Sequence, residues 1–321
     1  MDKDSLSTAI RFEALGDVLR RMNSDDLSQE MLAKIRGRSD QSLDAEAKHA
    51  GVPQGQWPLY RAMIRGEPNA FMDELEAVDG LFKPGDIVLM TNPVSMGLVT
   101  GQKKTLYKDA RSSHVALIHA DFVCIDAMPG VGVTNRVVSK LLQPAGDDWR
   151  VIRCDQITDT DAIMQACGYY LAQPYLVFPS KLSAKSYAYC SELARKVYAR
   201  CGVKDVGIPD DYVIAPAHFD KLADGVAGLP HWQDITETVR PAVEFCSKYE
   251  ALVDISVRLF VEGLLLNRKR YEERAEWLKR IKQQERFGKI SNEKAAELRA
   301  QIQSIENKMN HTFWDVRRPK A

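Results

Sequence analysis

Two short stretches of the sequence, residues 113–118 and 189–193, constrain the fold and the chemistry most strongly. The first, Ser-His-Val-Ala-Leu-Ile, has the composition of a β-strand and carries His114. The second, Tyr-Cys-Ser-Glu-Leu, opens a segment with helical spacing of apolar residues and places Cys190 in its first turn. The N-terminus of a helix stabilises an anion by about 0.3–1 kcal/mol, and a nearby imidazolium lowers a thiol pKa by several units. Together, a strand histidine and this cysteine would hold a thiolate at neutral pH.

The histidine strand is predicted to form a β-hairpin with the strand that follows it. A three-residue turn centred on Ala120 would join the two strands. This register pairs residue 114 with residue 126, so that His114 and Asp126 face each other across the ladder. The carboxylate could then orient the imidazole, although a slip of one residue would send the two side chains to opposite faces. The same register places His119 at the solvent-exposed tip of the turn.

Apolar patterning and turn residues predict the other core elements: strands over 87–90 and 149–154, an extended stretch over 212–216, and helices over 159–172, 190–201 and 217–222. The segment 97–105 is predicted to be a loop. It fails the spacing of a phosphate-binding loop because only three residues separate Gly97 from Gly101 and Gln102 follows. The Gly-Val-Gly turn at 130–132 is followed by no Rossmann pattern. We therefore expect no cofactor.

Both ends of the chain are predicted to be helical extensions around a catalytic domain over residues 81–230. The N-terminal extension, 1–80, leans acidic and contains an amphipathic pattern over 5–22. The C-terminal extension, 231–321, is basic from Arg268 onward, and a break near Gly288 predicts an antiparallel helical hairpin. The basic tail could be a solvated face or could meet an anionic membrane surface. An immunity or delivery protein is the other partner we expect at these extensions.

Cysteine usage and charge limit the cellular setting. None of the six cysteines lies in a CxxC pair or at metal-site spacing, which favours a reduced protein without a metal. The formal net charge is zero, and we expect no nucleic-acid partner. The sequence opens without the basic and apolar regions of a signal peptide, and no apolar run is long enough for a bilayer. We therefore expect the protein to be cytoplasmic as synthesised.

Several motifs follow one another along residues 81–222: Pro-Gly-Asp before a strand, Ser-His-Val-Ala-Leu, a strand ending Ile-Asp-Ala, a Gly-Val turn, a Val-Ile-Arg strand, a helix, and Tyr-Cys-Ser-Glu-Leu. This order resembles the circularly permuted NlpC-type papain-like proteins, the YiiX/YebB-like cysteine hydrolases, which are relatives of lecithin–retinol acyltransferase. The resemblance implies an α+β fold, in which a permuted papain-like core has an antiparallel β-sheet packed on helices. N-terminal helices and a C-terminal helical hairpin would be added to that core.

The resemblance also implies roles for individual residues. Cys190 would be the nucleophile and His114 the general base and later acid. Asp126 falls at a third polar position where the family often has Glu, and Tyr175 matches a tyrosine common before the cysteine. We also expect Tyr189 and Ser113, which precede the two reactive residues in the sequence, to bind substrate.

The expected chemistry is covalent acyl transfer through a thioester on the cysteine. Acyl esters of lipids or of acylated amphiphiles are the favoured substrates, which would make the enzyme phospholipase-like, and peptidoglycan or peptide amides are the alternative. Without a signal peptide, one hypothesis is a toxin-like antibacterial effector exported by a dedicated secretion system, and a housekeeping hydrolase is another. From a different class, the same fold could serve as a non-catalytic binding module.

Overall fold

The computed structural model describes residues 33–177, 187–211, 213–226, 228 and 230–308. The amphipathic pattern predicted over 5–22 therefore lies outside the described residues. The chain divides into two compact units. The larger unit comprises residues 50–53 and 68–261, and the second comprises the described parts of 1–49, 54–67 and 262–321. The three predicted regions, with limits at residues 80 and 230, stay a prediction.

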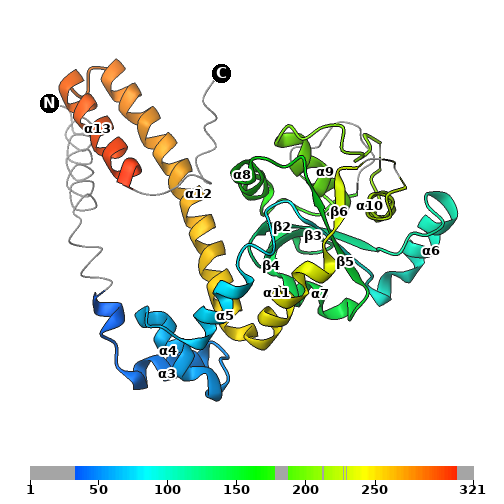
Figure 1. Cartoon of the computed structure of the whole chain (residues 1–321). Coiled ribbons are helices and arrows are strands. Elements are labelled where there is room, and N and C mark those ends of the chain that lie inside the picture. Colours follow the sequence, from blue (N-terminus) through cyan, green and yellow to red (C-terminus); the bar gives the residue numbers. More distant parts are fainter. Residues whose placement is uncertain (1–32, 178–186, 212, 227, 229, 309–321) are drawn as a thin grey trace. The chain divides into compact units, whose positions relative to one another are not determined.

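A six-stranded antiparallel sheet forms the centre of the larger unit (Figure 1). Its strands are β1 (Ile87–Met90), β2 (His114–Ala120), β3 (Val123–Met128), β4 (Gly132–Val137), β5 (Trp149–Cys154) and β6 (Trp232–Asp234). They are ordered β4-β3-β2-β1-β5-β6, and each neighbouring pair is antiparallel. All four residues of β1 are buried, as expected for a central strand that is covered on both faces.

Helices surround this sheet and make up the second unit: α3 (Asp40–His49), α4 (Trp57–Arg65), α5 (Ala70–Val78), α6 (Met96–Thr105), α7 (Val138–Leu142), α8 (Thr160–Tyr170), α9 (Cys190–Arg200), α10 (Pro216–Ala223), α11 (Thr236–Lys248), α12 (Glu250–Arg286) and α13 (Asn292–Lys308). Short 3-10 helices, η1 (Gln54–Gln56), η2 (Pro93–Ser95) and η3 (Gln143–Ala145), join some of them. The predicted α+β class with an antiparallel sheet is confirmed. Within the described residues, no helix has the length and apolarity needed to cross a bilayer.

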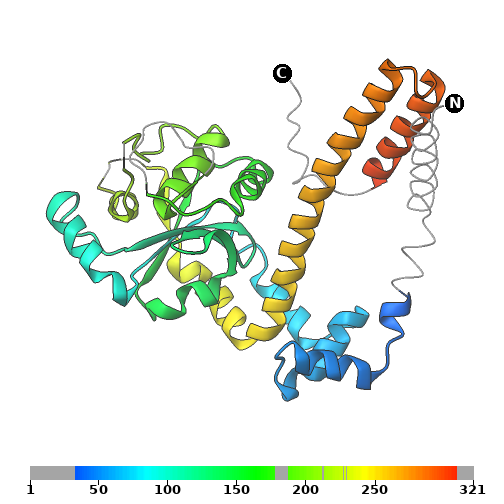
Figure 2. The ribbon, with the colours of Figure 1, turned by 180° about the vertical axis from the view of Figure 1, so that it is seen from behind.

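The main core lies between the sheet and helices α8 and α9. Leu117 of β2 and Ile125 of β3 pack in one cluster with Leu193 and Val197 of α9, and all four are fully buried. Burying an aliphatic side chain of this size contributes about 1.5–3 kcal/mol. Figures 1 and 2 show α8 and α9 on one side of the sheet and α7 and α11 on the other. Helix α9 is therefore fixed against the strand that carries His114.

Helix α9 differs from its predicted amphipathic form, because every residue from Cys190 to Tyr198 is buried. Its polar residues, including Glu192 and Lys196, lie inside the protein rather than in solvent. The helical spacing of apolar residues located the helix correctly. It could not show that other elements also cover the polar side.

The segment 97–105, predicted to be a loop, belongs to helix α6 instead. Its two glycines argue against a helix, but tertiary contacts outweigh them. The buried side chain of Gln102 donates to the carbonyl oxygen of Ser112 at 3.0 Å and accepts from the backbone N–H of Ala217 at 2.8 Å. These long-range bonds hold the helix where local propensity does not predict one.

The predicted hairpin register is wrong by two residues. Leu117 lies opposite Ile125, and Ile118 lies opposite Cys124. The ladder is irregular between Ile118 and Ala120, and β2 extends through His119 instead of ending before it. A shift of two residues keeps the same side chains on the same face of a strand.

His119 is buried rather than exposed at a turn tip. Its Nδ1 lies 3.0 Å from Oδ1 of Asn135, and its Nε2 lies 3.1 Å from the carbonyl oxygen of Met164 in α8. Strand β2 is buried on both faces from Val115 to His119, and both ring nitrogens of His119 have polar partners inside the protein. Burial lowers the pKa of His119, which favours a neutral ring with a structural role.

The second unit contains two helix pairs. In the first, α3 and α4 are joined by ion pairs from Arg61 to Asp44 at 2.6 Å and from Arg65 to Asp40 at 2.5 Å. In the second, α12 and α13 pack around the buried side chains of Ile281 and Leu298. The turn between these helices contains Gly288 at a positive φ of 67°, at the break that the sequence predicted.

Candidate active site

Cys190 is the first residue of α9, directly after the N-cap residue Tyr189. It is a free thiol, and its residue is only 9% exposed. Burial raises the pKa of the Cys190 thiol, but a hydrogen bond and charge interaction with His114 lower it. The Ser191 hydroxyl and the backbone N–H of Val115 lower it further, and the net pKa falls below its ordinary value. Because the dipole of α9 also favours negative charge at this end, the site suits a thiolate.

His114 joins Cys190 to Asp126. Its Nε2 lies 3.0 Å from Oδ2 of Asp126, which leaves Nδ1 for the thiol of Cys190. Burial alone would lower the pKa of His114. Hydrogen bonds and charges from Asp126 and Cys190 outweigh burial and raise it to about 10. A raised imidazole pKa beside a lowered thiol pKa is the pattern of a thiolate–imidazolium pair.

Asp126 is fully buried and has a second cationic neighbour that the sequence did not indicate. Oδ1 of Asp126 lies 3.2 Å from Nε of Arg136 in β4. The contact is an ion pair without the geometry of a hydrogen bond. Arg136 lies opposite Cys124 in the ladder, two pairs along from Asp126 and Thr134 and on the same face. No local motif marks Arg136, and only an accurate register for β3 and β4 could have found it.

Two predicted substrate-binding residues use their hydroxyl groups to hold the backbone of the site. Oγ of Ser113 accepts a hydrogen bond from the backbone N–H of Asn92 at 2.8 Å. The hydroxyl oxygen of Tyr189 accepts from the backbone N–H of Ile214 at 2.9 Å. Both side chains are nearly fully buried. Both hydroxyl groups therefore hold neighbouring backbone in place, and a role in substrate binding stays a prediction for Ser113 and Tyr189.

Tyr175 lies beside the segment that leads to Cys190. It forms an isolated parallel bridge with Ala188, two residues before the cysteine, and its half-buried ring packs against the main core. Burial raises the pKa of Tyr175, and the charge of a Cys190 thiolate raises it further. The structure therefore brings Tyr175 beside the segment that precedes Cys190, and its role in lining the site stays a prediction.

A buried carboxylate fixes the backbone just before His114. Asp220 of α10 accepts hydrogen bonds from the backbone N–H groups of Arg111 and Ser112 at 2.8 and 2.9 Å, and from Oγ of Ser112 at 2.7 Å. Arg150 in β5 donates to the same carboxylate at 3.1 Å. No local pattern in the sequence marks Asp220, which lies more than a hundred residues from Arg111 and Ser112.

A buried charge pair lies one turn into α9. Nζ of Lys196 is 3.4 Å from Oε1 of Glu192, and Lys196 also donates to the carbonyl oxygen of Tyr187. Burial raises the pKa of Glu192 and lowers that of Lys196. Lys196 thus holds the chain on the N-terminal side of Cys190.

Comparisons with known proteins add little to this geometry. No protein-family model matches the chain, and no curated protein matches it either. A crystal structure described as the metalloprotein yiiX from Escherichia coli O157:H7, DUF1105, is similar over 48% of this chain and 96% of that chain. The two share 18% sequence identity, with a TM-score of 0.34. This weak likeness to a YiiX structure carries no argument about activity. In the described part of the chain, no group of three or more His, Cys, Asp or Glu residues could hold a metal ion.

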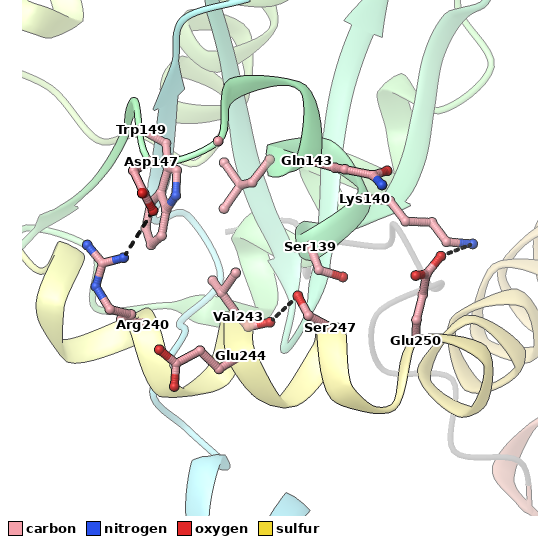
Figure 3. Close-up of a pocket in the computed structure, with 12 residues that line it drawn as sticks. Ser139, Lys140, Gln143, Asp147, Trp149, Arg240, Val243, Glu244, Ser247 and Glu250 are labelled. Atoms are coloured by element: carbon pink, nitrogen blue, oxygen red, sulfur yellow. Dashed lines mark hydrogen bonds and ion pairs between the residues drawn. The ribbon is translucent and has the colours of Figure 1, made fainter. Parts of the chain in front are cut away.

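A cavity of about 470 Å³ lies away from these residues, between α11 and the α7–η3 segment (Figure 3). Its lining includes Trp149, Ser139, Lys140 and Arg240. Lys140 is paired with Asp254 at 2.8 Å, and Arg240 is held by Glu237 at 2.8 Å with its guanidinium over the Trp149 ring. These cations are already paired, and Cys190, His114 and Asp126 take no part in the lining.

Proposed function

We propose that this protein is a thiol hydrolase that transfers acyl groups through a thioester on Cys190. The observation that carries the proposal is the hydrogen-bonded series of Cys190, His114 and Asp126, in which the pKa of the thiol is lowered and that of the imidazole is raised to about 10. Perturbed titrating groups of this kind cluster at functional sites. A nucleophile, a base and a group that orients the base are the parts that covalent acyl transfer requires.

The reaction follows from these positions. The Cys190 thiolate attacks the carbonyl carbon of an ester or amide, and the backbone N–H of Cys190 at the start of α9 donates to the developing oxyanion. The carbonyl then re-forms and the bond to the leaving group breaks. The imidazolium of His114 gives its proton to the leaving oxygen or nitrogen. Neutral His114 next takes a proton from water, which attacks the thioester. The acid product leaves, and the thiolate and imidazolium are restored.

Asp126 and Arg136 support this cycle without touching the substrate. Asp126 accepts from Nε2 of His114, so that Nδ1 faces the thiol in each protonation state. Arg136 lies beside the other carboxylate oxygen, so the fully buried Asp126 has an ion-pair partner at each oxygen. Asp126 and Arg136 therefore act as positioning residues.

We assign this site to the permuted papain-like, NlpC-type group of YiiX/YebB-like hydrolases. The order of sequence motifs supports the assignment. The arrangement of elements is compatible with it, because the cysteine begins a helix that packs on the sheet and the histidine begins a strand earlier in the chain. Acyl esters of lipids are our preferred substrates, since the permuted branch includes lipid acyltransferases.

Mass spectrometry of a bacterial lipid extract tests the proposal. The extract is incubated with wild-type protein, with Cys190→Ala and with Cys201→Ala. Cys201 is a matched control because it is a partly exposed cysteine outside any disulfide, at the C-cap of the same helix. We expect free fatty acid and lysolipid from wild type and Cys201→Ala, and none from Cys190→Ala. Equal release by all three proteins would exclude Cys190 as the nucleophile. Unchanged lipids in every sample would exclude lipid esters, and peptidoglycan fragments would then be the substrates to test.

A further inference from the structure

Helix α6 and the segment after it expose an unusual combination of apolar and basic side chains. Met96 and Leu98 are each 49% exposed, and Leu106 is 39% exposed. Lys103, Lys104 and Lys108 are exposed as well. We call residues 93–108 the α6 segment. A soluble domain normally keeps large apolar side chains covered or isolated, so their grouping with lysines calls for an explanation.

The charge of the α6 segment is one-sided. The sequence contains no Asp or Glu between Asp86 and Asp109. In the described part of the chain, no carboxylate lies within ion-pair distance of the three α6-segment lysines, whereas Lys140 and Lys248 elsewhere in the same unit each have acidic partners. Unpaired lysines beside exposed apolar side chains complement an anionic surface that has an apolar interior.

The α6 segment is anchored, so its exposed side is a fixed surface. Val99 and Gln102 are buried on the inner side of α6. The hydroxyl of Tyr107 donates to Asp224 at 2.8 Å just beyond the helix. Figures 1 and 2 show α6 at the edge of the larger unit, away from the centre of the sheet. An anchored helix at the edge of a domain can contact a flat surface without unfolding.

The α6 segment leaves the sheet at the end where the candidate active site lies. Met90, the last residue of β1, is opposite His114, and the backbone N–H of Asn92 donates to Ser113. Two other exposed apolar positions adjoin the chain that leads to Cys190. Leu176, 47% exposed, donates its backbone N–H to Ala188, and Val213, 43% exposed, precedes the residue bonded to Tyr189. Exposed apolar side chains thus occur in α6, whose segment begins beside His114, and in two segments that adjoin the chain before Cys190.

We propose that the α6 segment docks the protein on anionic membrane surfaces. Met96 and Leu98 insert at the boundary of headgroups and acyl chains, and the lysines contact anionic headgroups. The biological role of this docking rests on the proposed function, because docking would bring Cys190 to an acyl ester in a bilayer. The binding itself needs no catalysis and can be tested separately from it.

Vesicle flotation with Cys190→Ala protein measures docking without turnover. Vesicles of equimolar phosphatidylcholine and phosphatidylglycerol are compared with vesicles of phosphatidylcholine alone. We expect binding to the anionic vesicles only, and about tenfold weaker partitioning after Met96→Ser combined with Leu98→Ser. Met72→Ser is the matched control, because Met72 is 44% exposed on α5. Circular dichroism melting verifies that each variant folds.

Charge variants provide a second measurement that does not depend on apolar side chains. Lys103→Gln combined with Lys104→Gln should weaken anionic vesicle binding about fivefold for each lysine removed. Lys279→Gln with Lys282→Gln, at exposed positions of α12, is the control for the basic tail. The proposal is overturned if protein without surface substitutions does not bind anionic vesicles. It is also overturned if the two α12 substitutions reduce binding and the two α6 substitutions do not. Self-association that is abolished by the Met96 and Leu98 changes would also overturn it, in favour of a second copy on this surface.

Hydrolysis of a soluble short-chain ester separates this proposal from the proposed function. In active protein with the α6 substitutions, turnover of the soluble ester should stay unchanged while hydrolysis of esters in anionic vesicles falls. Vesicle binding without hydrolysis of any ester would refute the proposed function and leave the docking surface standing. Equal hydrolysis of vesicle esters by wild type and by the α6 variants would refute a role for docking.

Discussion

Nε2 of His114 lies 3.0 Å from Oδ2 of Asp126, although the two residues are not opposite each other in the β-ladder. The observed pairing of Ile118 with Cys124 displaces them by two residues, so they are diagonal neighbours on one face. A two-residue displacement preserves the face, and long polar side chains can bridge the diagonal. The contact is therefore less sensitive to register than a directly opposed pair would be.

Asp126→Asn should uncouple the histidine from the cysteine. Without the carboxylate charge, the pKa of His114 falls from about 10 and the imidazolium is lost at lower pH. The pKa of Cys190 then rises toward its ordinary value, and each unit of rise reduces the thiolate fraction at neutral pH about tenfold. We expect the alkylation of Cys190 by iodoacetamide to become at least tenfold slower at pH 7, with its pH profile moved to higher pH.

Asp121→Asn is the control for this experiment. Asp121 lies in the turn of the same hairpin, exposed and at a positive φ of 42° that Asn also tolerates. The pH profile for alkylation of Cys190 in the Asp121→Asn variant should match that of the wild type. If Asp126→Asn also leaves the profile unchanged, Asp126 has no influence on the thiol. Labelling of wild-type Cys190 at the rate of a free thiol would contradict the thiolate–imidazolium pair itself.

Local patterns in the sequence were sufficient to assign the secondary structure that carries the site residues. The apolar spacing after Tyr189 placed Cys190 at the start of a helix, and the alternation around His114 placed it in a strand. The prediction that His114 and Asp126 share a face of the sheet was correct although the predicted register was wrong, because the error was an even number of residues. Strand and helix periods therefore carried most of the information about the three central residues.

Features that depend on long-range contacts were not accessible from the sequence. Gln102 stabilises α6 through groups 10 and 115 residues away, which overrides the low helix propensity of two glycines. His119 is buried because β2 continues through it and is covered on both faces. Arg136 and Asp220 carry ordinary charged side chains whose partners are set by sheet register and by the packing of α10. Each of these requires tertiary geometry.

Gly132→Ala should destabilise the protein more than Gly130→Ala. Both glycines have positive φ, 86° and 75°, so either substitution costs roughly 1–2 kcal/mol in backbone strain. A Cβ on Gly132 would lie 2.4 Å from the carbonyl oxygen of Gln173, whereas one on Gly130 would meet nothing within 4 Å. The clash displaces a backbone oxygen that accepts from Val133 at 2.8 Å, which adds about 1 kcal/mol or more. Urea unfolding measures both variants, and equal losses of stability would contradict the close approach.

Removing one member of the buried pair in α9 should be far more harmful than removing both. Glu192 and Lys196 are each about 1% exposed, so Glu192→Met leaves the Lys196 charge without a carboxylate partner inside the protein and should cost about 3–5 kcal/mol. Glu192→Met combined with Lys196→Met removes both charges and should recover much of that loss. A double-mutant cycle in urea gives the coupling free energy. The same cycle on Lys294 and Glu297, an exposed pair 3.2 Å apart, should give a coupling near zero.

The alkylation rate of Cys190 in the doubly substituted protein separates stability from positioning. Lys196 donates to the carbonyl oxygen of Tyr187, so it holds the chain that leads into the cysteine. Methionine at position 196 cannot make this hydrogen bond. We therefore expect the double variant to regain stability and yet to label more slowly than the wild type. Full recovery of both properties would mean that the pair stabilises α9 without positioning its first residue.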